Sequence, residues 1–241
     1  WENNRQFWWQ MSWRVPQIQP DTMLLANYAS DTVIIEEYHV SYPGTLIYYP
    51  GSKTIKIGSS PLLRYTAEKV ITGVSEDTTR RKVPIHSDFG KVLIAHFPTT
   101  TSCLHLVDGE LPLLSPGSDP LVQMIAPFSK IDLIEVDAEV HTPPAEIFGS
   151  EPAHSWCYYY QSASLAVQRA EWERVVSIEF EAQALDLKPV DPSEWVPFLY
   201  AYVNLDDYEN AKRIMSYFKD IDYLQHQVCV SLEKVEIGRL I

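Results

Sequence analysis

Apolar residues recur at helical spacing through the last third of the chain. Successive members lie three or four residues apart, which places them on one side of an α-helix. The stripes cover residues 156–170, 172–185, 195–202, 208–218 and 222–235. This pattern predicts consecutive helices joined by short turns, and therefore helical hairpins.

Two of the expected hairpins match in phase. Alignment of Trp172 with Tyr208 gives an offset of 36 residues (208 − 172), close to the ~34-residue period of tetratricopeptide repeats. In each hairpin a modest side chain, Val175 or Ala211, follows three residues later and allows two helices to approach. We therefore expect two tetratricopeptide-like hairpins, with the last helix covering the open end of the stack.

A capping signal precedes the helix expected over residues 195–202. Asp191 can accept orphan backbone N–H groups, Pro192 suits the first helical position, and Glu194 can reach back to the cap. We expect these residues to form a capping box.

The first half of the chain mixes strand-like and helix-like segments. We expect strands over residues 22–28, 45–49, 83–86, 92–97 and 103–107, and a crossover helix over residues 61–71. The first strand is almost continuously apolar, which is typical of a strand covered on both faces. The third and fourth strands flank a short connection in which Gly90 can supply a positive φ, so we expect a β-hairpin.

Proline and glycine cluster between the two patterns, at residues 142–144 and 149–152. A mixed sheet with helices around it is an α/β or α+β architecture. We therefore expect an α/β (or α+β) mixed-sheet domain over residues 1–149 and an all-α tetratricopeptide-like domain over residues 150–241.

The first residues predict an aromatic-rich helix that ends before Pro16. In one interpretation this helix lies against the sheet and buries two of its aromatic side chains. In the other, its indoles lie near a membrane interface, where ring bodies contact acyl chains and N–H groups stay hydrated. The indoles concerned are those of Trp1, Trp8, Trp9 and Trp13.

The charge balance narrows the possible partners. Nineteen basic and 32 acidic residues leave a formal net charge of −13, which repels the phosphates of nucleic acid and of anionic lipids. No apolar run reaches the ~18 residues that would mark a bilayer-spanning helix. Cys103, Cys157 and Cys229 lie far apart without the spacing of a zinc site, so we interpret them as small buried apolar residues.

Three histidines suggest an enzymatic alternative. His86, His96 and His105 could meet at one end of the sheet and hold a metal ion or act as a general base. However, the chain has no HExxH, GxSxG, Walker or GxGxxG motif. Structural roles for these histidines are therefore favoured, and we predict no catalytic residue and no cofactor.

Aromatic residues of the helical region are the better candidates for binding. Consecutive aromatic residues near the start of this region cannot all face one core, so one or two are expected to be exposed or packed against the first domain. They would form either an interdomain clamp or a surface that binds a peptide or a glycan. The candidate binding residues are Trp156, Tyr158, Tyr160, Trp195 and Tyr202.

Two stretches carry a family resemblance. The first comprises residues 7–16 and 18–22, and the second is an ordered series of motifs at residues 148–152, 156–160, 165–168, 171–172 and 194–198. They resemble the region after the last transmembrane helix of large bacterial multi-pass proteins that are glycosyltransferase-like. The similarity is thin over residues 32–61, so it does not imply a sheet topology.

The resemblance implies the soluble C-terminal domain of a polytopic membrane protein, on the extracytoplasmic side. The chain begins at Trp1 and not at a methionine, which agrees with a processed or excised segment. In such transferases the catalytic acidic residue lies in an early loop between membrane helices, so no catalytic residue carries over. Whether the parent chain is a glycosyltransferase follows only from this resemblance.

The preferred hypothesis is thus a non-catalytic accessory domain that docks on the membrane portion of its own parent chain. Its helical repeats would bind a protein partner, a glycan or an acceptor. The alternative is a small hydrolase or metal-dependent enzyme that uses the sheet-end histidines. A third hypothesis, a plain scaffold that assembles a complex, also remains open.

Overall fold

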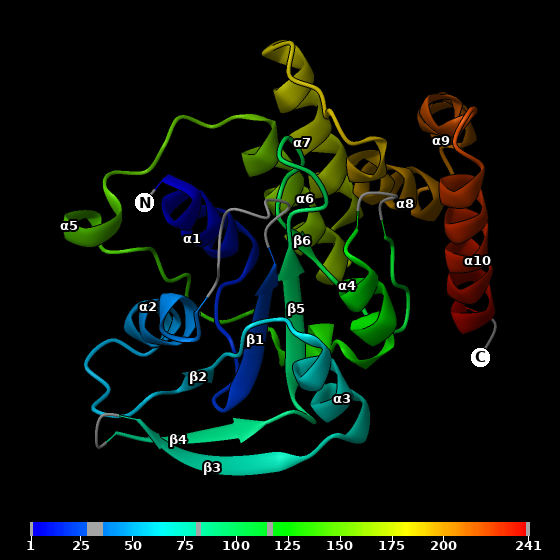
Figure 1. Cartoon of the computed structure of the whole chain (residues 1–241). Coiled ribbons are helices and arrows are strands. Elements are labelled where there is room, and N and C mark those ends of the chain that lie inside the picture. The colour runs from blue at the N-terminus through cyan, green and yellow to red at the C-terminus, as the bar shows by residue number, and fades with distance from the viewer. Residues whose placement is uncertain (1, 28–35, 81–82, 115–117, 240–241) are drawn as a thin grey trace. The chain divides into compact units, whose positions relative to one another are not determined.

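The computed structural model describes residues 2–27, 36–80, 83–114 and 118–239, which fall into two units (Figure 1). The first unit comprises residues 1–100 and 104–152. The second comprises residues 101–103 and 153–241. The main boundary therefore lies three residues after the expected one, and a short segment from the first half of the sequence belongs to the helical unit.

A four-stranded sheet forms the centre of the first unit. Its strands are β1 (Thr22–Asn27), β2 (Ile57–Gly58), β5 (Val92–His96) and β6 (His105–Leu106), in the order β2-β1-β5-β6. Strand β1 is parallel to both of its neighbours, whereas β6 is antiparallel to β5. The mixed sheet expected from the sequence is confirmed.

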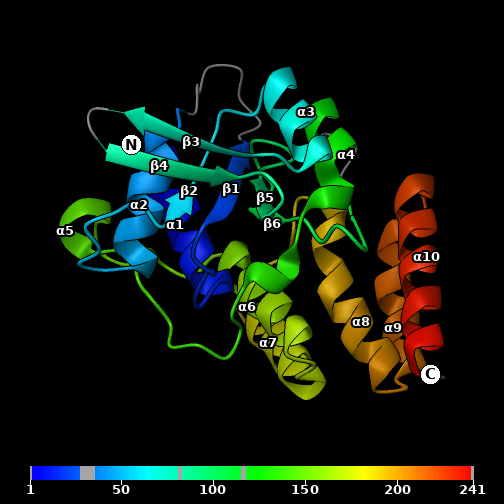
Figure 2. The same ribbon diagram turned by 90° about the horizontal axis from the view of Figure 1, so that it is seen from below.

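The two faces of this sheet are covered by different helices (Figures 1 and 2). Helices α1 (Glu2–Arg14) and α2 (Tyr38–Tyr48) lie on one face, and α3 (Arg64–Thr72) and α4 (Pro120–Ile125) lie on the other. Because side chains alternate along a strand, β1 contributes to both cores. Leu24 packs with α1 and α2, whereas Leu25 packs with α3 and α4.

Helix α2 corrects the predicted strand over residues 45–49. Pro43 and Gly44 were expected to bracket a strand but lie inside the helix. A Cβ atom on Gly44 would lie 3.1 Å from Trp8 Cη2 and 3.2 Å from Ile57 Cγ2, so glycine permits the close packing of α2 at this point. Tertiary packing thus overrides the local proline–glycine signal.

The predicted hairpin between residues 83–86 and 92–97 is wrong. Strand β4 (Val83–Asp88) pairs antiparallel with β3 (Ser75–Arg80) in a separate two-stranded sheet, while β5 pairs with β1. Strand β5 is buried along its whole length, which suits a central position in a covered sheet. Gly90 does not have a positive φ.

The remaining elements of the first unit are short. They are η1 (Ala126–Phe128), η2 (Ile131–Leu133) and α5 (Ala145–Phe148).

The second unit is helical. Its elements are α6 (Trp156–Gln168), α7 (Trp172–Ala184), η3 (Pro192–Trp195), α8 (Val196–Asn204), α9 (Tyr208–Met215), η4 (Ser216–Phe218) and α10 (Asp222–Arg239). Each of α6, α7 and α8 packs against the helix that follows it, and α6 also contacts α8. Among the residues that the structure describes, no helix is both long and apolar enough to cross a bilayer.

The turns of the two hairpins repeat at the offset of 36 residues. Ala170 and Asp206 both have a φ of 56°. The N–H of Glu171 donates to the carbonyl of Ala166 at 2.9 Å, and the N–H of Asp207 donates to that of Tyr202 at the same distance. The offset of 36 residues between the two turns is therefore present in the backbone geometry.

The first half of the expected capping box is present. The carboxylate of Asp191 accepts the backbone N–H of Ser193, and Pro192 occupies the first position of η3. Glu194 is 1% exposed. Its carboxylate accepts the backbone N–H of Cys103 at 2.6 Å and the indole N–H of Trp156 at 2.7 Å.

The short segment of residues 101–103 is also held covalently. Cys103 and Cys157 form a disulfide, so the interpretation of these cysteines as isolated apolar residues is wrong. Cys229 is a free, exposed thiol. The disulfide lies within the second unit and joins α6 to a segment 54 residues earlier in the sequence.

We predict that the double substitution of Cys103 and Cys157 by serine lowers the free energy of unfolding by up to about 4 kcal/mol, because it removes a crosslink across a long loop. Urea unfolding of the wild-type and double-mutant chains measures the difference. The double mutant should not respond to reductant. Equal stability of the two oxidised chains would contradict the prediction.

Candidate binding grooves

A groove of about 690 Å³ lies on the helical unit. We call it the repeat groove and define it by Phe180, Leu187, Trp195, Arg213 and Tyr217. These residues come from α7, the α7–η3 connection, η3, α9 and η4. The two hairpins thus contribute to one hollow surface.

One wall of the repeat groove is aromatic. The rings of Trp195 and Tyr217 pack with centroids 5.0 Å apart, and Phe180 is 59% exposed. Trp195 itself is held from behind by Trp156 and Phe198, with ring centroids 5.0 and 5.7 Å away. Such supported aromatic side chains offer large contact areas with little loss of side-chain entropy on binding.

A buried carboxylate fixes the polar side of the groove. Glu179 on α7 accepts hydrogen bonds from Arg213 Nη2 of α9 at 2.8 Å and from the Tyr202 hydroxyl of α8 at 2.6 Å. Its carboxylate also accepts the side-chain N–H of Gln183. Burial and the bond to Glu179 raise the pKa of Tyr202, which keeps its phenol protonated as a donor.

We predict that Glu179→Ala lowers the free energy of unfolding by about 2–3 kcal/mol, because it leaves Tyr202 and the partly exposed Arg213 without their shared acceptor. Glu181→Ala on the same helix is the matched control. Its ion pair with Arg174 is about half exposed on both sides, so its loss should cost less than about 1 kcal/mol. Urea unfolding compares the two variants, and equal losses would contradict the proposed role of Glu179.

The five aromatic residues selected from the sequence take different places. Trp156 and Tyr202 are 6% and 2% exposed and belong to the core of the helical unit. Tyr158 and Tyr160 on α6 are partly exposed, and the ring of Tyr158 stacks on His154. Trp195 lines the repeat groove. The stripes that carry Trp156 and Tyr202 are thus packing stripes, since they face neighbouring helices.

The tryptophans proposed for a membrane interface are mostly internal. Trp8 and Trp9 are 0% and 5% exposed and pack in the first unit, and Phe7 is buried as well, so the helix buries three aromatic side chains where two were expected. Trp13 is partly exposed, and its indole N–H donates to Glu151 at 2.9 Å. Trp1 lies outside the described residues. The rings of Trp8 and Trp9 are therefore not available to a lipid surface in this fold.

The three histidines do not form a common ligand set. His96 and His105 face each other across β5 and β6, with ring centroids 5.8 Å apart and both residues buried. His86 lies on β4 of the other sheet, where its ring is half-exposed and Nδ1 lies 2.8 Å from Asp77 Oδ1. The prediction that all three converge at one sheet end is wrong, because β4 does not pair with β5.

The hydrogen bond to Asp77 raises the pKa of His86 above its ordinary value of 6.5. The resulting stabilisation is complete below pH 6.5 and is lost as the pH rises through the raised pKa of the folded state. We predict an NMR titration midpoint for His86 above 6.5 that returns toward 6.5 in Asp77→Asn. An unchanged midpoint in that variant would exclude Asp77 as the cause.

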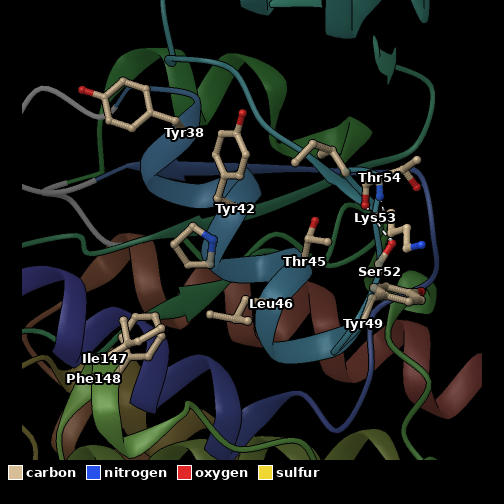
Figure 3. A pocket seen from close by; sticks show the side chains of 13 residues that line it. Tyr38, Tyr42, Thr45, Leu46, Tyr49, Ser52, Lys53, Thr54, Ile147 and Phe148 are labelled. Carbon is tan, nitrogen blue, oxygen red and sulfur yellow. Dashed lines mark hydrogen bonds between the residues drawn. The ribbon is translucent and has the colours of Figure 1, made fainter. Parts of the chain in front are cut away.

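A second groove of about 690 Å³ lies on the first unit (Figure 3). We call it the α2 groove and define it by Tyr38, Tyr42, Leu46, Lys53 and Ile147. Three of these residues lie on α2, one lies in the loop that follows it, and Ile147 lies on α5. The loop with Lys53 and the side chain of Ile147 lie on opposite sides of the view, with Leu46 between them (Figure 3).

Sequence reasoning missed most of both grooves. Phe180, Arg213 and Tyr217 lie off the apolar stripes, and an exposed aromatic residue on the polar side of a predicted helix was the available signal. Tyr38 and Tyr42 preceded a segment interpreted as a strand. Their four-residue spacing, continued by Leu46, was the signal for an apolar ridge on a helix.

Comparison of the chain with protein-family models, with curated proteins and with solved structures gives no match.

Proposed function

We propose that this chain is a non-catalytic interaction domain of a membrane-embedded, glycosyltransferase-like protein. In this proposal the helical hairpins act as tetratricopeptide-like repeats, and the repeat groove binds an extended segment of a partner or acceptor protein. The aromatic and cationic lining of the repeat groove is the observation that carries the proposal.

The composition of this groove supports protein recognition. Tryptophan, tyrosine and arginine are the side chains that most often dominate binding energy at protein interfaces. Trp195, Tyr217 and Arg213 line the groove together, and the Glu179 carboxylate holds Arg213 in place. A partner segment with an apolar anchor and a nearby carboxylate would match this surface.

The repeated turn geometry supports the tetratricopeptide-like assignment. Ala170 and Asp206 adopt the same left-handed conformation, and the helices that follow begin 36 residues apart, at Trp172 and Tyr208. The period and the hairpin form are those expected of such repeats. Helix α10 follows the second hairpin and buries Leu224, as a capping helix would.

The disulfide supports an extracytoplasmic location. Disulfides persist mainly in oxidising compartments, and the Cys103–Cys157 bond joins two distant parts of the sequence. Attachment to the membrane through the parent chain rests on the family resemblance of residues 7–22 and of the tail. The membrane portion of that chain is accordingly proposed as one partner.

Selection from a phage-displayed library of random peptides tests the function directly. We predict that selected peptides bind the 241-residue chain, and that Phe180→Ala with Tyr217→Ala weakens their binding about tenfold or more, because it removes the exposed aromatic wall. Fluorescence anisotropy with labelled peptides measures the affinities.

Tyr208→Ala is the matched control for this experiment, because Tyr208 is 59% exposed on α9 and does not line the groove. Binding to this variant should equal that of the wild type. Failure to select any peptide, or equal weakening by the control, would contradict the proposal.

A further inference from the structure

Helix α2 carries apolar side chains on two faces. Val40 and Ile47 are buried in the core against the sheet. Tyr38, Tyr42 and Leu46 are 53%, 45% and 38% exposed and follow one another at four-residue spacing. These three side chains form a straight ridge with steps of about 6 Å along the helix.

A second wall completes the α2 groove. Ile147 on α5 is 51% exposed and lies near Leu46 across the groove (Figure 3). Exposed apolar side chains therefore face the groove from both α2 and α5. The part of the groove between Leu46 and Ile147 is therefore suited to apolar side chains of a partner.

The charge of this groove differs from that of the whole chain. None of the described residues that line it is acidic, although the chain carries a net charge of −13. Lys53 is exposed at one end and forms no ion pair with any described residue. Glu36 and Glu37 precede α2 at the other end. The described lining of the groove is thus cationic at one end and has no acidic side chain.

We propose that the α2 groove binds a single amphipathic helix of a partner protein. The apolar stripe of that helix packs on Tyr42, Leu46 and Ile147, and an acidic residue in its last turn lies beside Lys53. A ridge of residues at four-residue spacing fits the groove between ridges of a second helix. This site is independent of the repeat groove.

Backbone chemistry favours a helix over an extended peptide. The ridge lies on α2, whose backbone groups are largely satisfied within the helix, so an added strand would find few hydrogen-bond partners along it. A helix satisfies its own backbone and can present only apolar side chains to the groove. The apolar character of the lining likewise disfavours a sugar, which needs many hydrogen bonds.

The size of the patch favours one helix over a second copy of the chain. A stable protein dimer buries about 800 Å² on each partner, well above the exposed apolar area available here. An amphipathic helix covers a narrower strip, and such grooves recur in peptide recognition.

Synthetic 18-residue amphipathic peptides test this proposal. Both probes carry leucine at i, i+3, i+4 and i+7 spacing and a fluorescent label, and one ends in two glutamates where the other ends in two lysines. We expect the glutamate probe to bind the 241-residue chain more tightly than the lysine probe. In the wild-type chain the glutamate probe should bind about threefold more tightly than the lysine probe. In Lys53→Glu the lysine probe should bind about threefold more tightly than the glutamate probe. Fluorescence anisotropy measures all four affinities.

The apolar contacts are tested by two substitutions. Tyr42→Ala should weaken binding of the glutamate probe about fivefold, and Leu46→Glu should weaken it about tenfold or more. Tyr65→Ala is the control, since Tyr65 is 49% exposed on α3 and lies outside the groove. Circular dichroism melting identifies any variant that fails to fold, and Ile147→Ala then replaces it. Equal binding of both probes, no reversal with Lys53→Glu, or equal weakening by Tyr65→Ala would overturn the proposal.

Discussion

The buried carboxylate of Glu179 is the constraint on which the helical unit depends. It is 0% exposed, and it receives donors from Tyr202 on α8 and Arg213 on α9 while its own backbone belongs to α7. A buried charge is tolerated only when it is paired and hydrogen-bonded, so these three helices must keep their relative register. That register also determines the shape of the repeat groove, because α7 and α9 both contribute residues to it.

A second buried carboxylate acts in the same unit. Glu194 on η3 binds the backbone of Cys103 and the indole of Trp156, and the Cys103–Cys157 disulfide closes the same region covalently. Trp156 in turn packs against Trp195, which lines the repeat groove. The polar contacts, the disulfide and the aromatic stack thus support one wall of the candidate site from behind.

The sequence predicts regular elements well where one burial pattern dominates. The continuous apolar run of β1 indicates a strand covered on both faces, and the structure buries it between two cores. Helix α2 is not predicted because its proline and glycine indicate turns in the sequence. In the structure this glycine, Gly44, permits close tertiary packing against Trp8 and Ile57. Strand β3 is not predicted because Ser75–Arg80 has no apolar alternation, so the sequence does not identify the partner of β4.

The candidate site is less predictable than the fold. The hairpin offset follows from the alignment of Trp172 with Tyr208, but apolar stripes identify the packed face of a helix and not its binding face. The predicted binding residues Trp156 and Tyr202 lie on such stripes and are buried, whereas the exposed Phe180 and Tyr217 lie off them. The disulfide was missed because 54 residues separate its cysteines, and only the fold brings them together.

Binding at the repeat groove is the central functional claim, and side-chain NMR resonances report on it most directly. A library-selected peptide is titrated into isotope-labelled protein. The indole N–H signals of the protein's tryptophans and the Nε–H signal of Arg213 are followed. The account predicts shifts of the Trp195 and Arg213 signals and an unchanged Trp172 signal. Shifts confined to residues outside the groove, with Trp195 and Arg213 unaffected, would contradict it.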